Sequence, residues 1–99
     1  MSAPLCIEGE LTVYAVHALK ERLLAALDES ARLQLDLSGV AEVDGAGIQL
    51  LLATQREARQ RDGALSLIGV PPQLRDALEL ANLHGEFTFT PAPELEPAA

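Results

Sequence analysis

Apolar residues follow two different spacings in successive parts of the chain, and this alternation limits the possible folds more than any other property of the sequence. At 32–37, Leu33, Leu35 and Leu37 alternate with polar residues, a spacing typical of a β-strand. Between residues 14 and 27 the apolar residues instead recur every three or four positions, which is typical of a helix. Strands that alternate with helices predict an α/β domain with a mostly parallel sheet and right-handed crossovers.

The pattern divides the chain into a series of short elements. Two short strands at 5–8 and 11–13 are expected to flank a turn at Glu8-Gly9-Glu10. The other expected elements are a helix at 14–27, a strand at 32–37, a helix at 45–61, a strand at 64–70, a helix that begins at Pro71-Pro72, and an edge strand at 87–90. We therefore expect one domain over residues 1–90, followed by a loose, proline-rich tail at 91–99.

The charge of the chain narrows the class of partner. Fifteen acidic residues against seven basic ones give a net charge of −8 on 99 residues. Such a surface repels nucleic acid and anionic lipid, so a protein with a neutral or basic patch is the better candidate partner. The alternative, that the acidity only keeps the domain soluble, stays open at this point.

The chain carries no sign of export or membrane insertion. Cys6 is its single cysteine, so no intrachain disulfide can form, as in proteins of reducing compartments. Residues 1–4 have neither the basic cluster nor the apolar region of a signal peptide. No stretch approaches the roughly 20 apolar residues of a membrane span. We expect a cytoplasmic protein.

The most informative segment is 35–47, where a buried strand leads through a loop to a helix. Asp44 is suited to be the helix N-cap, because its carboxylate can accept from free amides of the first turn. Gly45, Ala46 and Gly47 follow it, although each glycine in a helix costs about 1 kcal/mol relative to alanine. Either they leave the backbone bare for another molecule, or they only allow close packing inside the domain. The residues alone favour neither.

Other kinds of chemistry find little support in the sequence. Gly45 and Gly47 fit neither the dinucleotide fingerprint nor a P-loop. His17 and His84 have no Cys, Asp or Glu at a convincing metal-ligand spacing, and Ser38 stands in no nucleophile motif. We therefore expect no catalytic residue, no metal and no cofactor. A small-molecule pocket formed by the loop and the acidic face remains an alternative.

Three stretches resemble the STAS domain family, whose name joins sulfate transporters and anti-sigma factor antagonists. They are LDLSGVAEVDGAGIQLLL at 35–52, EGELT at 8–12 and LSLIGVPPQLRDALELANLHGEF at 65–87. The likeness extends over about residues 5–90. It implies a mixed, mostly parallel sheet with helices mainly on one face. It also implies a non-enzymatic regulatory domain that docks through the loop and helix start on a partner.

The chain departs from the family at the position that matters most for regulation. In anti-sigma factor antagonists, the Ser or Thr directly after the Asp is phosphorylated by the partner kinase, which disrupts the complex by charge. Here that position is Gly45, followed by Ala46, and neither has a hydroxyl. Thr12 replaces the Asp of the family's Gly-Glu-Leu-Asp turn. We therefore expect no phosphorylation at residue 45 and constitutive partner binding, or regulation elsewhere.

The resemblance and the residue types together give a predicted partner-binding set. Its members are Ser38, Gly39, Asp44, Gly45, Ala46, Gly47 and Gln49. Asp44 is expected to orient the loop, the three small residues to form a flat contact, Ser38 and Gly39 to shape the approach to it, and Gln49 to add a hydrogen bond at the rim. Candidate partners are a serine kinase that acts as an anti-sigma factor, the ATPase of an ABC-type lipid transporter, or a chemosensory component.

Overall fold

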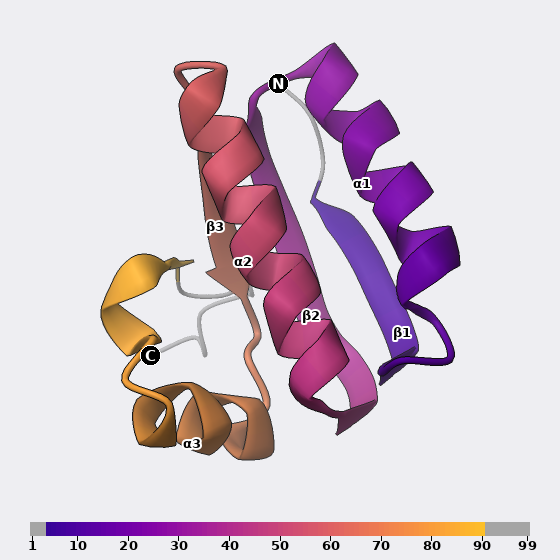
Figure 1. Cartoon of the computed structure of the whole chain (residues 1–99), viewed down its shortest axis with the longest axis vertical. Coiled ribbons are helices and arrows are strands. Elements are labelled where there is room, and N and C mark those ends of the chain that lie inside the picture. The colour runs from indigo at the N-terminus through magenta and orange to yellow at the C-terminus, as the bar shows by residue number, and fades with distance from the viewer. Residues whose placement is uncertain (1–3, 91–99) are drawn as a thin grey trace, which may run out of the picture.

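The computed structural model describes residues 4–90 of the chain (Figure 1). The predicted tail at 91–99 lies outside the described residues, so the domain boundary at residue 90 stays a prediction. The elements in order are β1 (Leu5–Leu11), α1 (Val16–Glu29), β2 (Arg32–Val43), α2 (Gly45–Gln60), β3 (Ala64–Ile68), α3 (Pro72–Leu80), a short 3-10 turn (His84–Glu86) and β4 (Thr88–Thr90).

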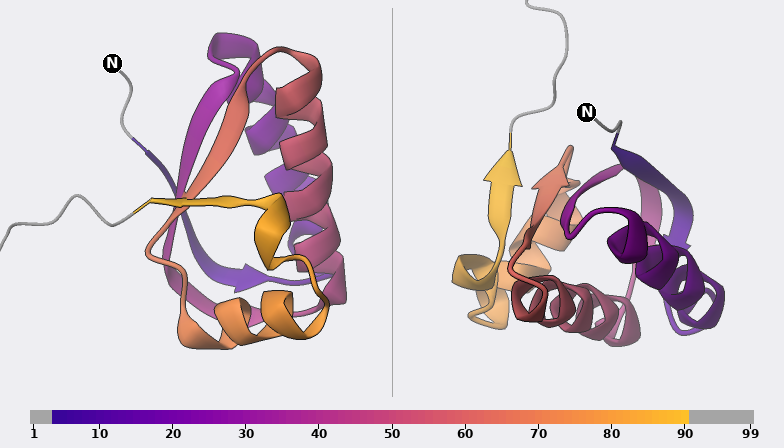
Figure 2. Two further views of the ribbon diagram at one scale, coloured as in Figure 1. Left: turned by 90° about the vertical axis from the view of Figure 1, so that its left-hand side faces the viewer. Right: turned by 90° about the horizontal axis from the view of Figure 1, so that it is seen from above.

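The four described strands form one sheet with helices mainly on one face. The strand order is β1-β2-β3-β4, and every neighbouring pair is parallel. Figure 2 shows α1 and α2 lying side by side against the same face, while α3 sits at the end of the sheet where α2 begins. The predicted α/β architecture is confirmed. No pair of described strands is antiparallel, so the mixed pairing that we expected is not seen here.

The prediction of two short strands around a turn at Glu8-Gly9-Glu10 was wrong. These residues lie inside one strand, β1, which pairs with β2 along its length. Gly9 has φ +86°, a value that side chains other than glycine adopt at a steric cost, and the register with β2 shifts on either side of it. Glycine here accommodates a bulge rather than a reversal of the chain.

The prediction that Ser38-Gly39 ends the next strand was also wrong. β2 continues through both residues to Val43, because β1 supplies a parallel partner as far as the pairing of Leu11 with Val43. Val40 is buried on this extension. The loop that we expected between the strand and the helix is therefore only Asp44.

The apolar residues that alternate along the strands and those that form one face of each helix pack together in an aliphatic core. Leu35 and Leu37 of β2 and Leu65 and Leu67 of β3 are fully buried. The helices add the following buried residues to this core: Leu19, Leu23 and Leu27 from α1, Leu51, Leu52 and Ala58 from α2, and Leu74 and Leu78 from α3. Burial of each of these leucine side chains stabilises the fold by about 1.5–3 kcal/mol, and this packing holds the start of α2 in a fixed place.

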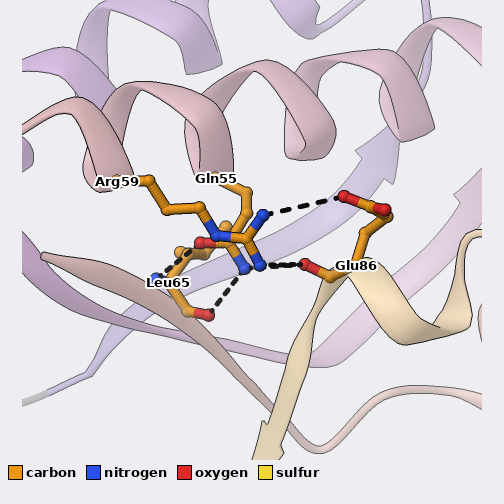
Figure 3. A network of polar contacts seen from close by, with 4 residues as sticks. All are labelled: Gln55, Arg59, Leu65 and Glu86. Carbon is orange, nitrogen blue, oxygen red and sulfur yellow. Dashed lines mark hydrogen bonds and ion pairs between the residues drawn. The ribbon is translucent and has the colours of Figure 1, made fainter.

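A polar network fixes the second half of α2 (Figure 3). Gln55 is buried, and its amide exchanges hydrogen bonds with the backbone of Leu65: Oε1 accepts the N–H at 3.0 Å, and Nε2 donates to the carbonyl at 3.4 Å. Nε2 also donates to the carbonyl of Glu86 at 2.9 Å, as does the Arg59 guanidinium at 3.2 Å. One helix thus positions both β3 and the segment that leads into β4.

Candidate functional site

Asp44 joins the end of β1 to the start of α2. Its Oδ1 accepts the N–H of Gly47 at 3.0 Å, which is the predicted N-cap, and its Oδ2 accepts the N–H of Val13 at 3.0 Å. Its own N–H donates to the carbonyl of Leu11 at 3.2 Å. The two carboxylate oxygens therefore fix the first turn of α2 and the β1–α1 turn relative to each other.

The same contacts set the charge of Asp44. Hydrogen bonds from the backbone N–H groups of Val13 and Gly47 stabilise the carboxylate and lower the pKa of Asp44 below its usual value. The side chain is thus ionised at neutral pH, and it places a negative charge at the rim of the helix start.

The two glycines of the first turn differ in what surrounds them. At Gly45 a Cβ would meet nothing within 4 Å, and the residue is exposed. At Gly47 a Cβ would overlap the carbonyl group of Leu11, and the residue is buried. The packing interpretation therefore holds for Gly47, and the open-surface interpretation holds for Gly45. Our prediction that Gly47 is part of a flat contact is corrected: β1 already occupies the space beside it.

The other predicted residues fall into two groups. Half-buried Ala46 and exposed Gln49 lie on the first turns of α2, close in sequence to Asp44 and Gly45. Ser38 and Gly39 instead lie in the middle of β2, and Gly39 pairs with Glu8. Asp44 comes six positions after Ser38, which corresponds to about 20 Å of fully extended strand. The structure thus does not place Ser38 and Gly39 in a loop that leads to the helix start.

Ser38 makes two local hydrogen bonds to Asp36 within β2. Its hydroxyl donates to Asp36 Oδ1 at 2.7 Å, and its N–H donates to the same oxygen at 3.0 Å. These two hydrogen bonds lower the pKa of Asp36. A Cβ on Gly69, which follows β3, would lie 2.9 Å from Ser38 Cβ. Ser38 is therefore exposed beside the β3–α3 connection rather than beside α2.

A shallow groove of about 670 Å³ opens beside Gly45. The β1–α1 turn and the end of β2 form one side of it, α2 contributes its first turn, and α3 lies across from them. Gln73 Nε2 donates to the carbonyl of Ala41 at 2.8 Å and so holds α3 against β2. The groove is lined, among others, by Glu10, Tyr14, Glu42, Gly45, Ile48 and Ala77.

Sequence reasoning missed the β1–α1 turn as part of this site. The Tyr14 side chain is 90% exposed and Val13 is 57% exposed, although both are apolar. We had assigned Val13 to a strand and Tyr14 to the first position of a helix. The available signal was that the only tyrosine of the chain stands between two periodic segments, where no core position requires it.

Neither a cluster of metal-ligating side chains nor a membrane-crossing helix is found in the part of the chain that the structure describes. Within residues 4–90 no three His, Cys, Asp or Glu side chains gather in a way that could hold a metal ion. None of the helices in this range has both the length and the apolar character needed to cross a bilayer.

Comparison with known proteins gives consistent results in sequence and in structure. The family model described as Mlab, STAS domain, matches residues 2–92. The anti-sigma-B factor antagonist of Staphylococcus aureus (strain NCTC 8325 / PS 47) is 28% identical over 91 residues, 91% of this chain and 84% of that protein. The anti-sigma-B factor antagonist of Bacillus subtilis (strain 168) is 26% identical over 77 residues, 78% of this chain and 71% of that protein.

Solved structures share the fold over most of the chain. The anti-sigma factor antagonist SpoIIAA in its unphosphorylated form superposes with a TM-score of 0.67 at 18% identity, covering 91% of this chain and 83% of that one. A sulfate transporter family protein from Wolinella succinogenes gives a TM-score of 0.63 at 25% identity, with 90% and 80% covered. The arrangement of strands and helices around the α2 start is therefore a recurring one.

Proposed function

The chain belongs to the STAS domain family, and we propose that it is a non-enzymatic cytoplasmic adaptor that binds a protein partner at the start of α2. The proposed docking surface consists of Asp44, Gly45, Ala46 and Gln49. Ser38 and Gly39 are left out of it because they lie on β2. Gly47 is buried under this surface, and its lack of a side chain allows α2 to pack closely against β1.

The observation that carries this proposal is the open space at Gly45. A glycine in the first turn of a helix lowers helix stability, and nothing in the fold requires one at this position. Its bare backbone makes room for a closely approaching surface, next to a helix end whose free N–H groups carry partial positive charge. A partner that packs directly on the turn accounts for the missing side chain.

The names of the sequence relatives support one kind of partner. The two relatives described above, from Staphylococcus aureus and Bacillus subtilis, are named anti-sigma-B factor antagonists. We therefore propose an anti-sigma factor of the serine-kinase type as the partner. A transporter ATPase and a chemosensory protein are the other outcomes that partner identification can return.

Binding is proposed to be constitutive. Gly45 and Ala46 offer no hydroxyl to a kinase, and Thr54 further along α2 is buried, with its hydroxyl donated to the carbonyl of Leu50 at 2.7 Å. Ser38 is the exposed hydroxyl nearest in sequence to the helix start on its N-terminal side. Phosphate on Ser38 would indicate that this serine has replaced residue 45 as the site of regulation.

The decisive variant is Gly45→Glu, with Gly85→Glu as its matched control. Both glycines are exposed, and a Cβ at either would meet nothing within 4 Å, so both variants should fold. Affinity capture from the native cell with the wild type and both variants identifies proteins lost only from Gly45→Glu. Calorimetry with the purified partner should then show loss of binding for Gly45→Glu alone, because the added side chain occupies the open space into which the partner packs. Equal affinity of the two variants would exclude this docking surface.

Regulation is tested separately from docking. The wild type and Gly45→Ser are incubated with ATP and the captured kinase, and phosphate is mapped by mass spectrometry. We expect phosphate on residue 45 of the Ser variant and none on the wild type, because the site is open but lacks the acceptor. Stoichiometric phosphate on wild-type Ser38 would contradict constitutive binding and leave the docking surface in place.

A further inference from the structure

We propose that Tyr14 is the anchor of the complex and that the partner presents a basic segment to the groove beside it. This inference rests on the docking surface proposed above and adds two things to it. It names a contact residue outside α2, and it names the chemistry of the surface that α2 meets.

Tyr14 is held in place by its backbone while its side chain is unused by the fold. The Tyr14 N–H donates to Thr12 Oγ1 at 3.3 Å, and the preceding N–H of Val13 donates to Asp44 Oδ2. The Tyr14 hydroxyl makes no hydrogen bond to the described residues, and the side chain is 90% exposed. Because these hydrogen bonds already order the backbone of the turn, binding has to immobilise only the two side-chain torsions of the tyrosine.

Aromatic side chains of this kind dominate binding energies when a partner encloses them. Tyr14 lines the same groove as Gly45 and half-buried Ile48, so a partner that packs on the bare helix start also reaches the ring. Leu80, at the end of α3, is equally exposed at 89% but does not line the groove. It provides an internal control for exposed apolar surface.

The charge of the groove selects the partner. Its acidic lining residues are Glu10, Glu42 and Asp44, and no Lys, Arg or His side chain lines it. Glu10 accepts the Thr12 hydroxyl at 2.7 Å but is paired with no cation among the described residues. The groove therefore favours a cationic segment. Arginine suits it best, because a guanidinium can pair with a carboxylate and stack on a tyrosine ring.

A second copy of this chain is a poorer occupant. Two copies would bring their acidic grooves, each on a body of net charge −8, against each other. Like charges brought together in an interface oppose association. We therefore assign the groove to a different protein with arginine or lysine at the contact.

Site-specific crosslinking tests both parts of the inference in the native cell. The photoreactive residue p-benzoylphenylalanine is placed at Tyr14, at Gln49 on the docking surface, or at Leu80. We expect the Tyr14 and Gln49 positions to crosslink the same protein, through peptides rich in Arg and Lys, and the Leu80 position to leave that protein unlinked. Crosslinks from Gln49 without any from Tyr14 would overturn the anchor and leave the docking surface intact.

Two further outcomes of the crosslinking are informative. Failure at both Tyr14 and Gln49 would overturn the docking surface together with the anchor. A crosslinked peptide that is acidic, or that comes from a second copy of this chain, would overturn the basic-partner assignment.

Affinity measurements with the crosslinked protein, purified, give the size of the effect. Tyr14→Ala should weaken binding about 30-fold or more, as expected for a hot-spot residue. Leu80→Ala should leave binding unchanged, and thermal melts should show both variants folded. Glu42→Gln should slow association and reduce its dependence on salt. Tyr14→Ala with wild-type affinity, or association that does not respond to salt, would refute the inference.

Discussion

The two ends of α2 use polar and small residues in opposite ways. In its second half, Gln55 and Arg59 direct their hydrogen bonds inward, to the backbone of β3 and of the segment before β4. At its start, Gly45 and Gln49 direct nothing inward and are exposed. The second half of α2 thus contributes hydrogen bonds to the fold, whereas its first turns leave side chains and backbone exposed to solvent. Residue type alone does not tell which of the two a position does, since Gln55 is buried and Gln49 is exposed.

Gly45 and Gly47 make the same comparison within a single turn. Leu11 fills the space beside Gly47, whereas Gly45 faces open space. A glycine that the fold requires and a glycine that the fold only tolerates thus stand two residues apart. Substitutions that separate these two situations are the most direct way to test the comparison.

The largest effect is expected from Gly47→Ala. The added methyl group would overlap the carbonyl of Leu11, so α2 and β1 must move apart. Overpacking of this kind costs about 3 kcal/mol where the obstructing atom is backbone and cannot rotate away. Urea unfolding of the variant and the wild type measures the loss.

Gly45→Ala is the matched control for this prediction. It should leave the free energy of unfolding unchanged or raise it by up to about 1 kcal/mol, because alanine favours helix and the space is open. Equal destabilisation by the two substitutions would break the distinction between the glycines.

A smaller loss is expected from Gln55→Leu in the second half of the helix. The Leu65 N–H would lose its side-chain acceptor inside the protein, while the Glu86 carbonyl keeps Arg59. An unpaired buried N–H costs about 1–3 kcal/mol, which chemical denaturation can resolve. Exposed Gln49→Leu should change stability by no more than about 0.5 kcal/mol. A similar loss of stability in Gln55→Leu and Gln49→Leu would mean that the hydrogen bonds of Gln55 do not make the second half of α2 more important for stability than its start.

The smallest effect concerns Asp44 and depends on pH. In Asp44→Asn the new amide side chain has one acceptor oxygen for the two N–H groups of Gly47 and Val13, so this variant should be less stable than the wild type at neutral pH. Because folding lowers the pKa of Asp44, its contribution is present above the unfolded value near 3.8 and is lost as pH falls through the folded value. The stability gap between the two proteins should therefore narrow below pH 3.8.

Unfolding curves at neutral pH and at several values below 3.8 measure this gap. Asp76→Asn on α3 is the control, since Asp76 is exposed and accepts no hydrogen bond in the described part of the chain. A gap between wild type and Asp44→Asn that stays constant with pH would show that the carboxylate charge does not stabilise this junction.

Much of the fold could be read from the sequence because the signals were local. The 3.6-residue period gave α1, α2 and α3 to within two residues or so, and the Asp44 cap fixed the start of α2 correctly. The two misread segments, at Gly9 and at Ser38-Gly39, look like turns locally. They are strand because β1 and β2 pair with each other over that length.

Part of the proposed docking surface could be read from the sequence. The sequence identified Asp44, Gly45 and Ala46, because an N-cap and two residues without extended side chains are visible in a single short string. It placed Ser38 and Gly39 beside them, because the continuation of β2 depends on a partner strand. It left out Tyr14, because the exposure of a side chain depends on elements distant in the chain.

The amino-acid sequence alone is enough to predict the order and type of most elements, the cap of α2, the acidic charge and the absence of a hydroxyl at residues 45 and 46. Each of these is a property of adjacent residues. Three further facts emerge only from the folded chain: Gly47 packs against Leu11, Gly45 faces open space, and the acidic residues of two separate segments line one groove with Tyr14. These contacts depend on which segments, far apart in the sequence, the hydrophobic core brings together. The pattern of adjacent residues does not specify those pairings.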